Sequence, residues 1–225
     1  MGMKIGLIGG TGDIGEGLAV RWGLETGHEI LVGSRSAEKA SARAAAFLGK
    51  IEAAGKKGRA SIVGVTNEDA AKQAEIVVLC VEAATVAATL RDLRGHLNPE
   101  KIVVTPAVSM ARKGGFFHYT PPAEGSMAAH LAGILGEEIP LVSAFHTVPA
   151  HKLSTPGAGI DQDVVVLGDH PEAKKTIMSL AAEIPGLKPI DGGALVTSSL
   201  VESITPLLIN LAIVNKRKNI AIKFV

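Results

Sequence analysis

The amino-acid sequence predicts an α/β protein with a doubly wound, mostly parallel sheet, helices on both faces, and a smaller C-terminal α/β unit. Over the first 105 residues, short runs of β-branched and aliphatic residues alternate with helical segments. Short connections in β-α-β order imply parallel strands and right-handed crossovers. Aromatic residues make up only 3% of the 225-residue chain, whereas 26 residues are glycine. A core of Ala, Val, Ile and Leu lets helices lie close to a sheet, which suits this layered architecture.

The first half of the chain contains five expected strands and four expected helices. Aliphatic and β-branched runs predict strands at 4–8, 29–32, 60–65, 76–81 and 101–105. The segments between them predict helices at 14–25, 37–54, 67–74 and 83–97. Gly27 closes the first helix, Ser36 is the expected N-cap of the second, and Asn67 that of the third. The run 76–81 is apolar throughout, as is typical of a strand buried on both faces.

The alternation changes after Pro106. Residues 107–122 contain Gly114-Gly115 and Pro121-Pro122 and are expected to form a loop. The pattern then predicts a helix at 126–135, a strand at 140–144, a β-α-β unit at 163–167, 171–183 and 187–190, and a terminal helix at 195–219 interrupted by Pro206. The proline-containing stretch 147–161 predicts a junction, which divides the chain into domains at 1–146 and 147–225.

Composition excludes several classes of protein. The 23 Lys+Arg balance 22 Asp+Glu, so the net charge of +1 gives no global attraction to nucleic acid or acidic membranes. The single cysteine, Cys80, permits no intrachain disulfide and fits a reducing, cytoplasmic compartment. The histidines lack the spacing of a metal site, so we expect no metal. Polar residues interrupt the long apolar stretches, and we expect neither a targeting segment nor a membrane span.

A glycine motif follows the first expected strand and opens the first expected helix. Gly10-Thr11-Gly12-Asp13-Ile14-Gly15 matches G-x-G-x-x-G. A plain β-α turn also needs small residues, but this setting is that of a dinucleotide site. There the glycines let backbone N–H groups approach a pyrophosphate at the positive end of a helix dipole. The motif therefore predicts a Rossmann-type dinucleotide-binding domain at 1–146.

The end of the second expected strand discriminates between cofactors. An NAD site usually places Asp or Glu there to bond the ribose 2′-hydroxyl. This chain has Gly33-Ser34-Arg35 instead, with no acid before Glu38. The guanidinium of Arg35 suits a 2′-phosphate, Ser34 can donate its hydroxyl, and Lys39 adds a second cation. A solvated basic patch is the alternative, but the start of a helix is an unfavourable place for one. We therefore expect NADP.

Five segments together resemble the family of coenzyme F420-dependent NADP oxidoreductases. They are Gly9–Ala19, Val32–Arg35, Asn67–Ala71, Ser143–Ala150 (Ser-Ala-Phe-His-Thr-Val-Pro-Ala) and Leu200–Leu207 (Leu-Val-Glu-Ser-Ile-Thr-Pro-Leu). The similarity runs from residue 3 to the end of the chain, and the last two motifs are the most specific. The resemblance implies hydride exchange between the deazaflavin F420 and NADP, with F420 as co-substrate.

The resemblance also implies a set of cofactor contacts. The family's NADP contacts map onto Gly10, Thr11, Gly12, Asp13, Ile14, Gly15, Ser34, Arg35, Lys39, Val81, Thr85, Met110 and Val148. The sequence departs from the family where Glu82-Ala83-Ala84 replaces the usual proline and aromatic residue after the fourth strand, and where the loop 107–112 lacks a second proline.

His146 is the candidate residue for the chemistry. It follows an apolar strand, at the carboxyl end where ligands collect in open α/β sheets. A neutral imidazole there could hydrogen-bond the deazaflavin, and an ordinary histidine pKa also suits proton transfer. The alternative is a histidine satisfied by backbone contacts. With the resemblance, we interpret His146 as a pocket residue, since hydride transfer depends chiefly on holding two rings face to face.

Two further expectations concern binding surfaces. F420 carries a phosphate and an oligoglutamate tail, so its site should offer cations. Candidates are Arg112-Lys113, His151-Lys152 and Lys216-Arg217-Lys218, although the last is also a favourable basic cluster near a helix C-terminus. The apolar face of residues 200–214 predicts a homodimer.

Two alternative functions remain open from sequence. One is a different NADP-dependent reductase on the same scaffold, acting on an imine, ketone or metal chelate. The other is a non-catalytic NADP-binding sensor of redox state. A sensor needs no second pocket, whereas 143–150 and 200–207 are expected to build one.

Overall fold

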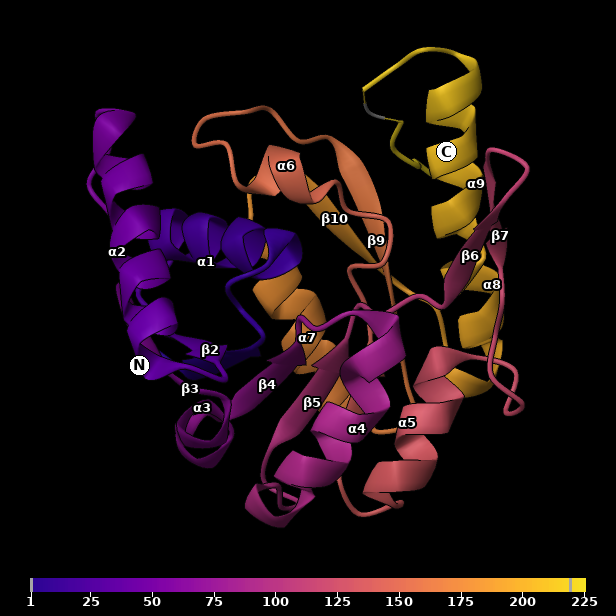
Figure 1. Ribbon diagram of the computed structural model, residues 1–225, viewed down its shortest axis with the longest axis horizontal. Helices are drawn as coiled ribbons and strands as arrows, with labels where there is room; N and C mark the ends of the chain where they lie inside the picture. The colour runs from indigo at the N-terminus through magenta and orange to yellow at the C-terminus, as the bar shows by residue number, and fades with distance from the viewer. Residues whose placement is uncertain (1, 219) are drawn as a thin grey trace.

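A computed structural model describes residues 2–218 and 220–225. In this part of the chain, eight strands form one sheet in the order β10-β9-β8-β5-β4-β1-β2-β3 (Figure 1). The strands are β1 (Lys4–Ile8), β2 (Glu29–Ser34), β3 (Ser61–Thr66), β4 (Ile76–Leu79), β5 (Ile102–Thr105), β8 (Leu141–Ser143), β9 (Gln162–Gly168) and β10 (Leu187–Asp191). Strands β1 to β5 and β8 are parallel, whereas β9 runs antiparallel to β8 and parallel to β10. The predicted fold class is confirmed.

Helices cover both faces of the sheet. Buried residues of α1 (Asp13–Glu25), α2 (Ala37–Ala53) and α7 (Pro171–Ala182) belong to one core cluster. Those of α3 (Asn67–Gln73), α4 (Ala83–Leu93) and α5 (Met127–Leu135) belong to the other. The strand order reverses at β1, because β2 and β3 extend the sheet on one side and β4, β5 and β8 on the other. Ligands of open α/β sheets bind at the carboxyl ends of the strands beside such a reversal.

The prediction of a loop over residues 107–122 is wrong. Met110–Lys113 (β6) and Phe116–Tyr119 (β7) form an antiparallel hairpin, with Gly114 and Gly115 as its turn. Both glycines have positive φ, 59° and 87°, which is the conformation that a two-residue hairpin turn requires. The side chain of Asn210 pairs with the free edge of β7: Phe117 N–H donates to its Oδ1 (2.8 Å) and its Nδ2 donates to the Phe117 carbonyl (2.7 Å).

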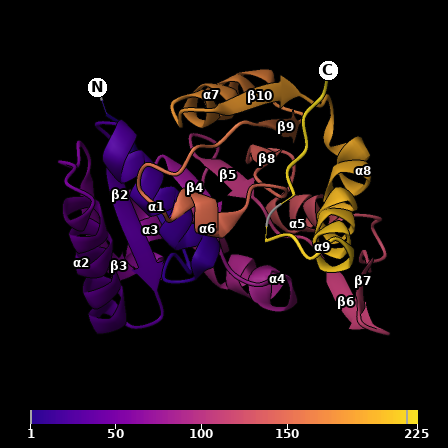
Figure 2. The ribbon, with the colours of Figure 1, turned by 90° about the horizontal axis from the view of Figure 1, so that it is seen from above.

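The terminal helix is divided and shorter than expected. Short turns at Arg94–His96 and Leu195–Thr197 precede β5 and α8 (Ser198–Glu202), and α9 (Ile204–Val214) begins after Ser203. The break precedes Pro206 because the missing N–H and the ring of a proline disrupt the turn before it. The expected helix reached Asn219, which lies outside the described residues. Figure 2 shows α8 and α9 beside the β6-β7 hairpin.

The division into domains at residue 146 stays a prediction. The chain after His146 forms α6 (Ala150–Leu153), β9, α7, β10, α8 and α9. Strand β9 pairs with β8 at two residue pairs, so both parts contribute to one sheet.

Within the described part of the chain, one segment meets the length and hydropathy criteria for a membrane span. Leu195–Val214 has a mean hydropathy of 1.5, and 17% of its most apolar 18-residue stretch is buried. Its middle holds Glu202, which is fully buried and hydrogen-bonded. A hydrogen-bonded buried carboxylate is consistent with packing against protein, and the absence of a membrane span stays a prediction.

Candidate active site

The glycine turn joins β1 to α1 and lies against the end of β2. Gly10 N–H is 2.9 Å from the carbonyl oxygens of Leu7 and Gly33. A Cβ on Gly15 would come within 2.4 Å of the Gly10 Cα, so glycine there permits the close packing of the helix on the turn. A Cβ on Gly12 would meet only the Gly9 oxygen, at 3.7 Å. Gly12 is the N-cap of α1 and supplies no side-chain cap. The turn thus offers open space at a helix N-terminus, which fits a pyrophosphate.

Asn67 contacts the glycine turn, and its predicted role as the N-cap of α3 is wrong. Thr66, not Asn67, caps α3, because its side chain accepts from Asp69 N–H. Asn67 Oδ1 instead accepts from Gly9 N–H (2.9 Å) and fixes the glycine turn. Asparagine is a good cap by type, and only the tertiary fold brings it to Gly9, 58 residues away in sequence.

The cationic residues lie at the end of β2. Ser34 is its last residue and is buried, while Arg35 and Lys39 are exposed. Neither Arg35 nor Lys39 forms an ion pair with the residues that the structure describes. The contact between Gly10 and Gly33 brings this end of β2 to the glycine turn. The arrangement fits a dinucleotide with a phosphate on its adenosine ribose.

The four remaining expected NADP contacts come from four different segments of the chain. Val81 lies against the glycine turn, since a Cβ on Gly9 would be 2.4 Å from the Val81 Cγ1. Thr85 is exposed in the first turn of α4, and its hydroxyl donates to the Glu82 carbonyl. Met110 is exposed at the start of the hairpin, whereas Val148 is buried in the loop after β8.

His146 is held in a sharp turn after β8. The preceding residue, Phe145, has a φ of 68°, an uncommon conformation for a residue with a side chain. Its ring is buried edge-on against Trp22, with ring centroids 5.9 Å apart. This packing holds the turn and directs the chain to the carboxyl edge of the sheet.

Burial makes His146 a neutral group. Its Nε2 and the Ser143 Oγ share a hydrogen bond of 2.9 Å, and its carbonyl accepts from the Thr205 hydroxyl at 3.0 Å. Burial lowers the pKa of His146 to about 4. The Nδ1 atom is buried and has no partner among the described residues. Buried polar atoms are nearly always hydrogen-bonded, so this nitrogen fits a ligand atom.

His146 lines a cavity of about 270 Å³ between the loop after β8 and helix α9. The cavity combines apolar walls with a few polar groups, as ligand sites do. It is lined by His146, Thr147, Val148, Pro149, His151, Thr205, Leu208, Ile209, Ala212, Lys218 and Ile220. The two motifs 143–150 and 200–207, far apart in sequence, therefore meet at one cavity, which Thr85 and Met110 do not line.

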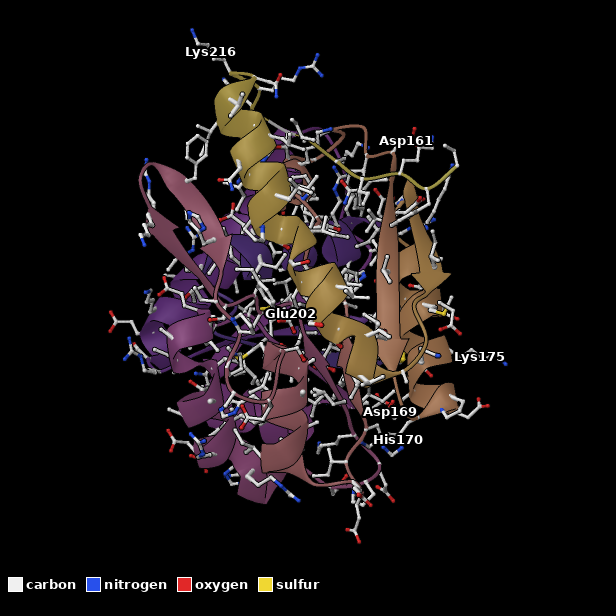
Figure 3. The ribbon with its side chains drawn as sticks, turned by 90° about the vertical axis from the view of Figure 1, so that its right-hand side faces the viewer. Asp161, Asp169, His170, Lys175, Glu202 and Lys216 are labelled. Carbon is white, nitrogen blue, oxygen red and sulfur yellow. The ribbon has the colours of Figure 1, made fainter. Side chains whose placement is uncertain are left out.

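The buried carboxylate of Glu202 connects the segments that lie around the start of α9. Glu202 accepts hydrogen bonds from Tyr119 Oη (2.8 Å), Met127 N–H (2.9 Å) and Ala128 N–H (3.0 Å). It thereby joins α8, the hairpin and the start of α5, in the position labelled in Figure 3. Burial raises the pKa of Glu202, although the three donors oppose the rise. Burial, and next the hydrogen bond to Glu202, raise the pKa of Tyr119.

A larger cavity, of about 660 Å³, lies where α5, β8 and β9 meet near Asp169 and His170. Figure 3 shows these two residues at the other end of the molecule from Lys216. The larger cavity contains none of the expected site residues, and β8 begins rather than ends there. Position at the carboxyl edge, rather than size, therefore identifies the smaller cavity as the candidate site.

The fold and the site define a Rossmann-type protein with a dinucleotide cradle and a second cavity at the same sheet edge, as in dinucleotide-dependent oxidoreductases. The family described as NADP oxidoreductase, coenzyme F420-dependent, matches residues 4–109. The F420-dependent NADP reductases of Methanothermobacter thermautotrophicus and Methanocaldococcus jannaschii are each 38% identical to the chain. The matches cover 99% and 98% of this chain and 95% and 97% of those proteins. The chain belongs to the F420-dependent NADP reductase family, which confirms the resemblance noted from sequence.

Solved structures agree with this assignment. A putative F420-dependent NADP reductase from Arthrobacter sp. FB24 matches with a TM-score of 0.81 and 26% identity, over all of both chains. An imine reductase from Bacillus cereus matches with a TM-score of 0.61 and 17% identity, over 95% of this chain and 63% of its own. The second likeness shows a shared fold alone.

Proposed function

We propose that this protein is a reductase that transfers a hydride reversibly between reduced coenzyme F420 and NADP. The observation that carries the proposal is the second cavity, which is lined by residues 146–149 and by Thr205 and the following turns of α9, at the sheet edge that also bears the glycine turn. Membership of the family supports the two substrates. The cavity also argues against a simple NADP sensor, which needs no second pocket.

The residues of the glycine turn and of β2 hold NADP. The first N–H groups of α1 and the open face of Gly12 receive the pyrophosphate. Ser34, Arg35 and Lys39 bind the 2′-phosphate, which favours NADP over NAD. Val81 packs against the glycine turn. Thr85, Met110 and Val148 complete the predicted contacts with NADP from three other segments.

The residues of the second cavity hold the deazaflavin. When bound, F420 and NADP supply the hydride chemistry themselves, and the protein must position them. The apolar side chains of Val148, Leu208 and Ile209 pack against a planar ring and exclude water. His146 presents a neutral imidazole that is held by its hydrogen bond to Ser143. The Nδ1 atom of His146, which has no partner among the described residues, orients the deazaflavin ring. At neutral pH His146 acts as a hydrogen-bonding group and not as a charged acid, because its pKa is about 4.

Two basic side chains at the same cavity are candidates for binding the acidic tail of F420. His151 and Lys218 come from two of the three basic clusters singled out in the sequence, and both line the cavity. Arg112 lies on the hairpin, where its guanidinium stacks 5.9 Å from the Phe117 ring centroid. We therefore assign the tail to His151 and Lys218 in preference to Arg112 and Lys113.

The function is tested by mixing purified protein with reduced F420 and NADP and following the return of the deazaflavin absorbance. We expect turnover with NADP, and far slower turnover with NAD at equal concentration. The same mixture without protein is the control. Absence of hydride exchange, with both substrates shown to bind by calorimetry, would overturn the proposal.

We also propose that the protein is cytoplasmic and forms a homodimer. Large apolar side chains are exposed along α8 and α9: Leu200, Leu207, Leu211 and Val214. Contiguous apolar surface of this kind marks an interaction site. Light scattering after size-exclusion chromatography should give twice the 23.2 kDa mass of the chain. The variant Leu207→Asp should shift the mass toward that of the monomer, and a wild-type monomer would contradict the dimer.

A further inference from the structure

Helix α1 carries a buried cation that the proposed chemistry does not use. Arg21 is 3% exposed and lies on the helix that begins at the glycine turn. Within the described structure, its guanidinium donates to backbone carbonyls alone: Nε to Leu153 (3.0 Å), and Nη2 to Lys152 (2.8 Å), Thr155 (3.0 Å) and Ala158 (2.7 Å). Among the described residues it has no carboxylate within ion-pair distance.

Burying the charge of an arginine without an ion-pair partner costs desolvation free energy. Burial lowers the pKa of Arg21, and the charge of Glu25 only partly opposes this. An apolar side chain would avoid the desolvation of the charge. The guanidinium satisfies carbonyls of an irregular segment, 152–158, most of which lies outside helices and strands. What the arginine contributes is therefore the geometry of this segment.

The segment is continuous with the wall of the second cavity. Val148, Pro149 and His151 line the cavity, and Arg21 holds the residues that follow. Gly17, one helical turn before Arg21, packs on the same stretch: a Cβ there would lie 2.7 Å from the Leu153 Cβ and 2.9 Å from the Ala150 oxygen. Figure 1 shows α6 lying beside α1. Residues four apart share one face of a helix, so α1 contacts the segment along that face.

One rigid helix therefore connects the two halves of the site. The N-terminus of α1 forms the dinucleotide cradle, and Gly17 and Arg21 hold the segment that extends the wall of the second cavity. Hydride transfer requires the two rings at close distance, and a displacement of about 1 Å can cost a hundredfold in rate.

We propose that Arg21 is a positioning residue that sets the distance between the NADP cradle and the F420 cavity. The inference rests on the proposed function. It acts through the loop that bears His151 and Val148, so its loss should affect the second substrate and the transfer step rather than NADP binding.

The test compares Arg21→Met and Arg21→Lys with a matched control on a second arginine. Arg94 lies before the amino end of β5, and its Nη2 also donates to a backbone carbonyl, that of Leu135 at the end of α5 (2.7 Å). Arg21→Met should leave the NADP dissociation constant within about twofold and lower kcat/KM for F420 by roughly ten- to a hundredfold. Arg21→Lys, which keeps the charge and part of the hydrogen bonding, should fall between. Arg94→Met, which also removes a guanidinium bonded to a backbone carbonyl, should lower thermal stability while the kinetic constants stay within about twofold.

Amide hydrogen exchange gives a readout that does not depend on turnover. The backbone amides of Ser154, Thr155, Gly157 and Ala158 should exchange faster in Arg21→Met than in wild type or Arg94→Met. If Arg21→Met does not fold, Gly17→Ala displaces the same segment while Arg21 remains, and should lower kcat/KM for F420 with NADP binding retained.

Failure of the proposed function and failure of the positioning role give different results. If the wild type transfers no hydride, the proposed function is refuted. Faster amide hydrogen exchange at residues 154–158 in Arg21→Met would still show that Arg21 holds this segment. Unchanged kinetics in Arg21→Met, or equal kinetic losses in Arg21→Met and Arg94→Met, would overturn the positioning role.

Discussion

Acid should destabilise the folded protein through His146. In the folded state burial lowers the pKa of His146 to about 4, whereas an unfolded chain gives histidine its ordinary value of about 6.5. Between these values the unfolded chain binds the proton and the folded protein does not. The stabilisation is therefore present above about pH 6.5 and is lost as the pH falls through about 4. A difference of about 2.5 pKa units corresponds to about 3 kcal/mol in the free energy of unfolding.

Urea unfolding over a series of pH values measures this contribution. From about pH 7 to about pH 4, the free energy of unfolding should fall by about 3 kcal/mol more in the wild type than in His146→Gln. The exposed His118 is the matched control, since His118→Gln should follow the wild type at every pH. A constant difference between wild type and His146→Gln across this range would refute the assignment of a buried, neutral imidazole.

The same property predicts the pH dependence of the reaction. His146→Ala should lower kcat/KM for F420 by roughly ten- to a hundredfold, as expected for one lost polar contact. NADP affinity should change little, because the NADP cradle lies at the glycine turn and β2. The ratio of wild-type to variant rates should be constant from about pH 5.5 to about pH 8, where His146 stays neutral. A ratio that changes near pH 6.5, or complete loss of transfer with intact binding, would instead identify His146 as a proton-transfer group.

Three other substitutions test the cradle and its support. Arg35→Ala should weaken NADP binding at least about tenfold and barely change NAD binding, because only NADP has the 2′-phosphate; equal losses in calorimetry would defeat this assignment. Gly12→Val should keep the circular dichroism spectrum of the wild type, since a Cβ at Gly12 meets only one atom, at 3.7 Å, but should abolish NADP binding; normal binding would mean that the open face is not the pyrophosphate site. Glu202→Gln should lower Tm by about 4–12 °C, because three donors converge on the carboxylate and an amide nitrogen would face one of them. The exposed Glu68→Gln should shift Tm far less, and equal shifts would contradict the role of Glu202.

Local sequence determined most of the N-terminal half. The strand β1 and the start and cap of α2 lie where periodicity and Ser36 predict them, because each signal acts within a few residues. The glycine motif and the missing acid after β2 are also local, and they predicted the cradle and the NADP preference. The break before α9 lies three residues before Pro206, within the reach of a proline on its helix.

Tertiary structure decided the features whose partners are far apart in sequence. The β6-β7 hairpin was missed because Met110–Lys113 lacks apolar alternation, and its edge is satisfied by Asn210, 93 residues from Phe117. Asn67 is a cap by residue type but binds Gly9, since Thr66 already caps the helix. His146 has an ordinary pKa by residue type, and only burial under the surrounding core lowers it. Arg21 resembles a surface arginine in an amphipathic helix until folding brings Ala158, 137 residues away, to its guanidinium. A hydrogen bond or a desolvated charge depends on which groups meet in space, and residue type and spacing alone do not specify that.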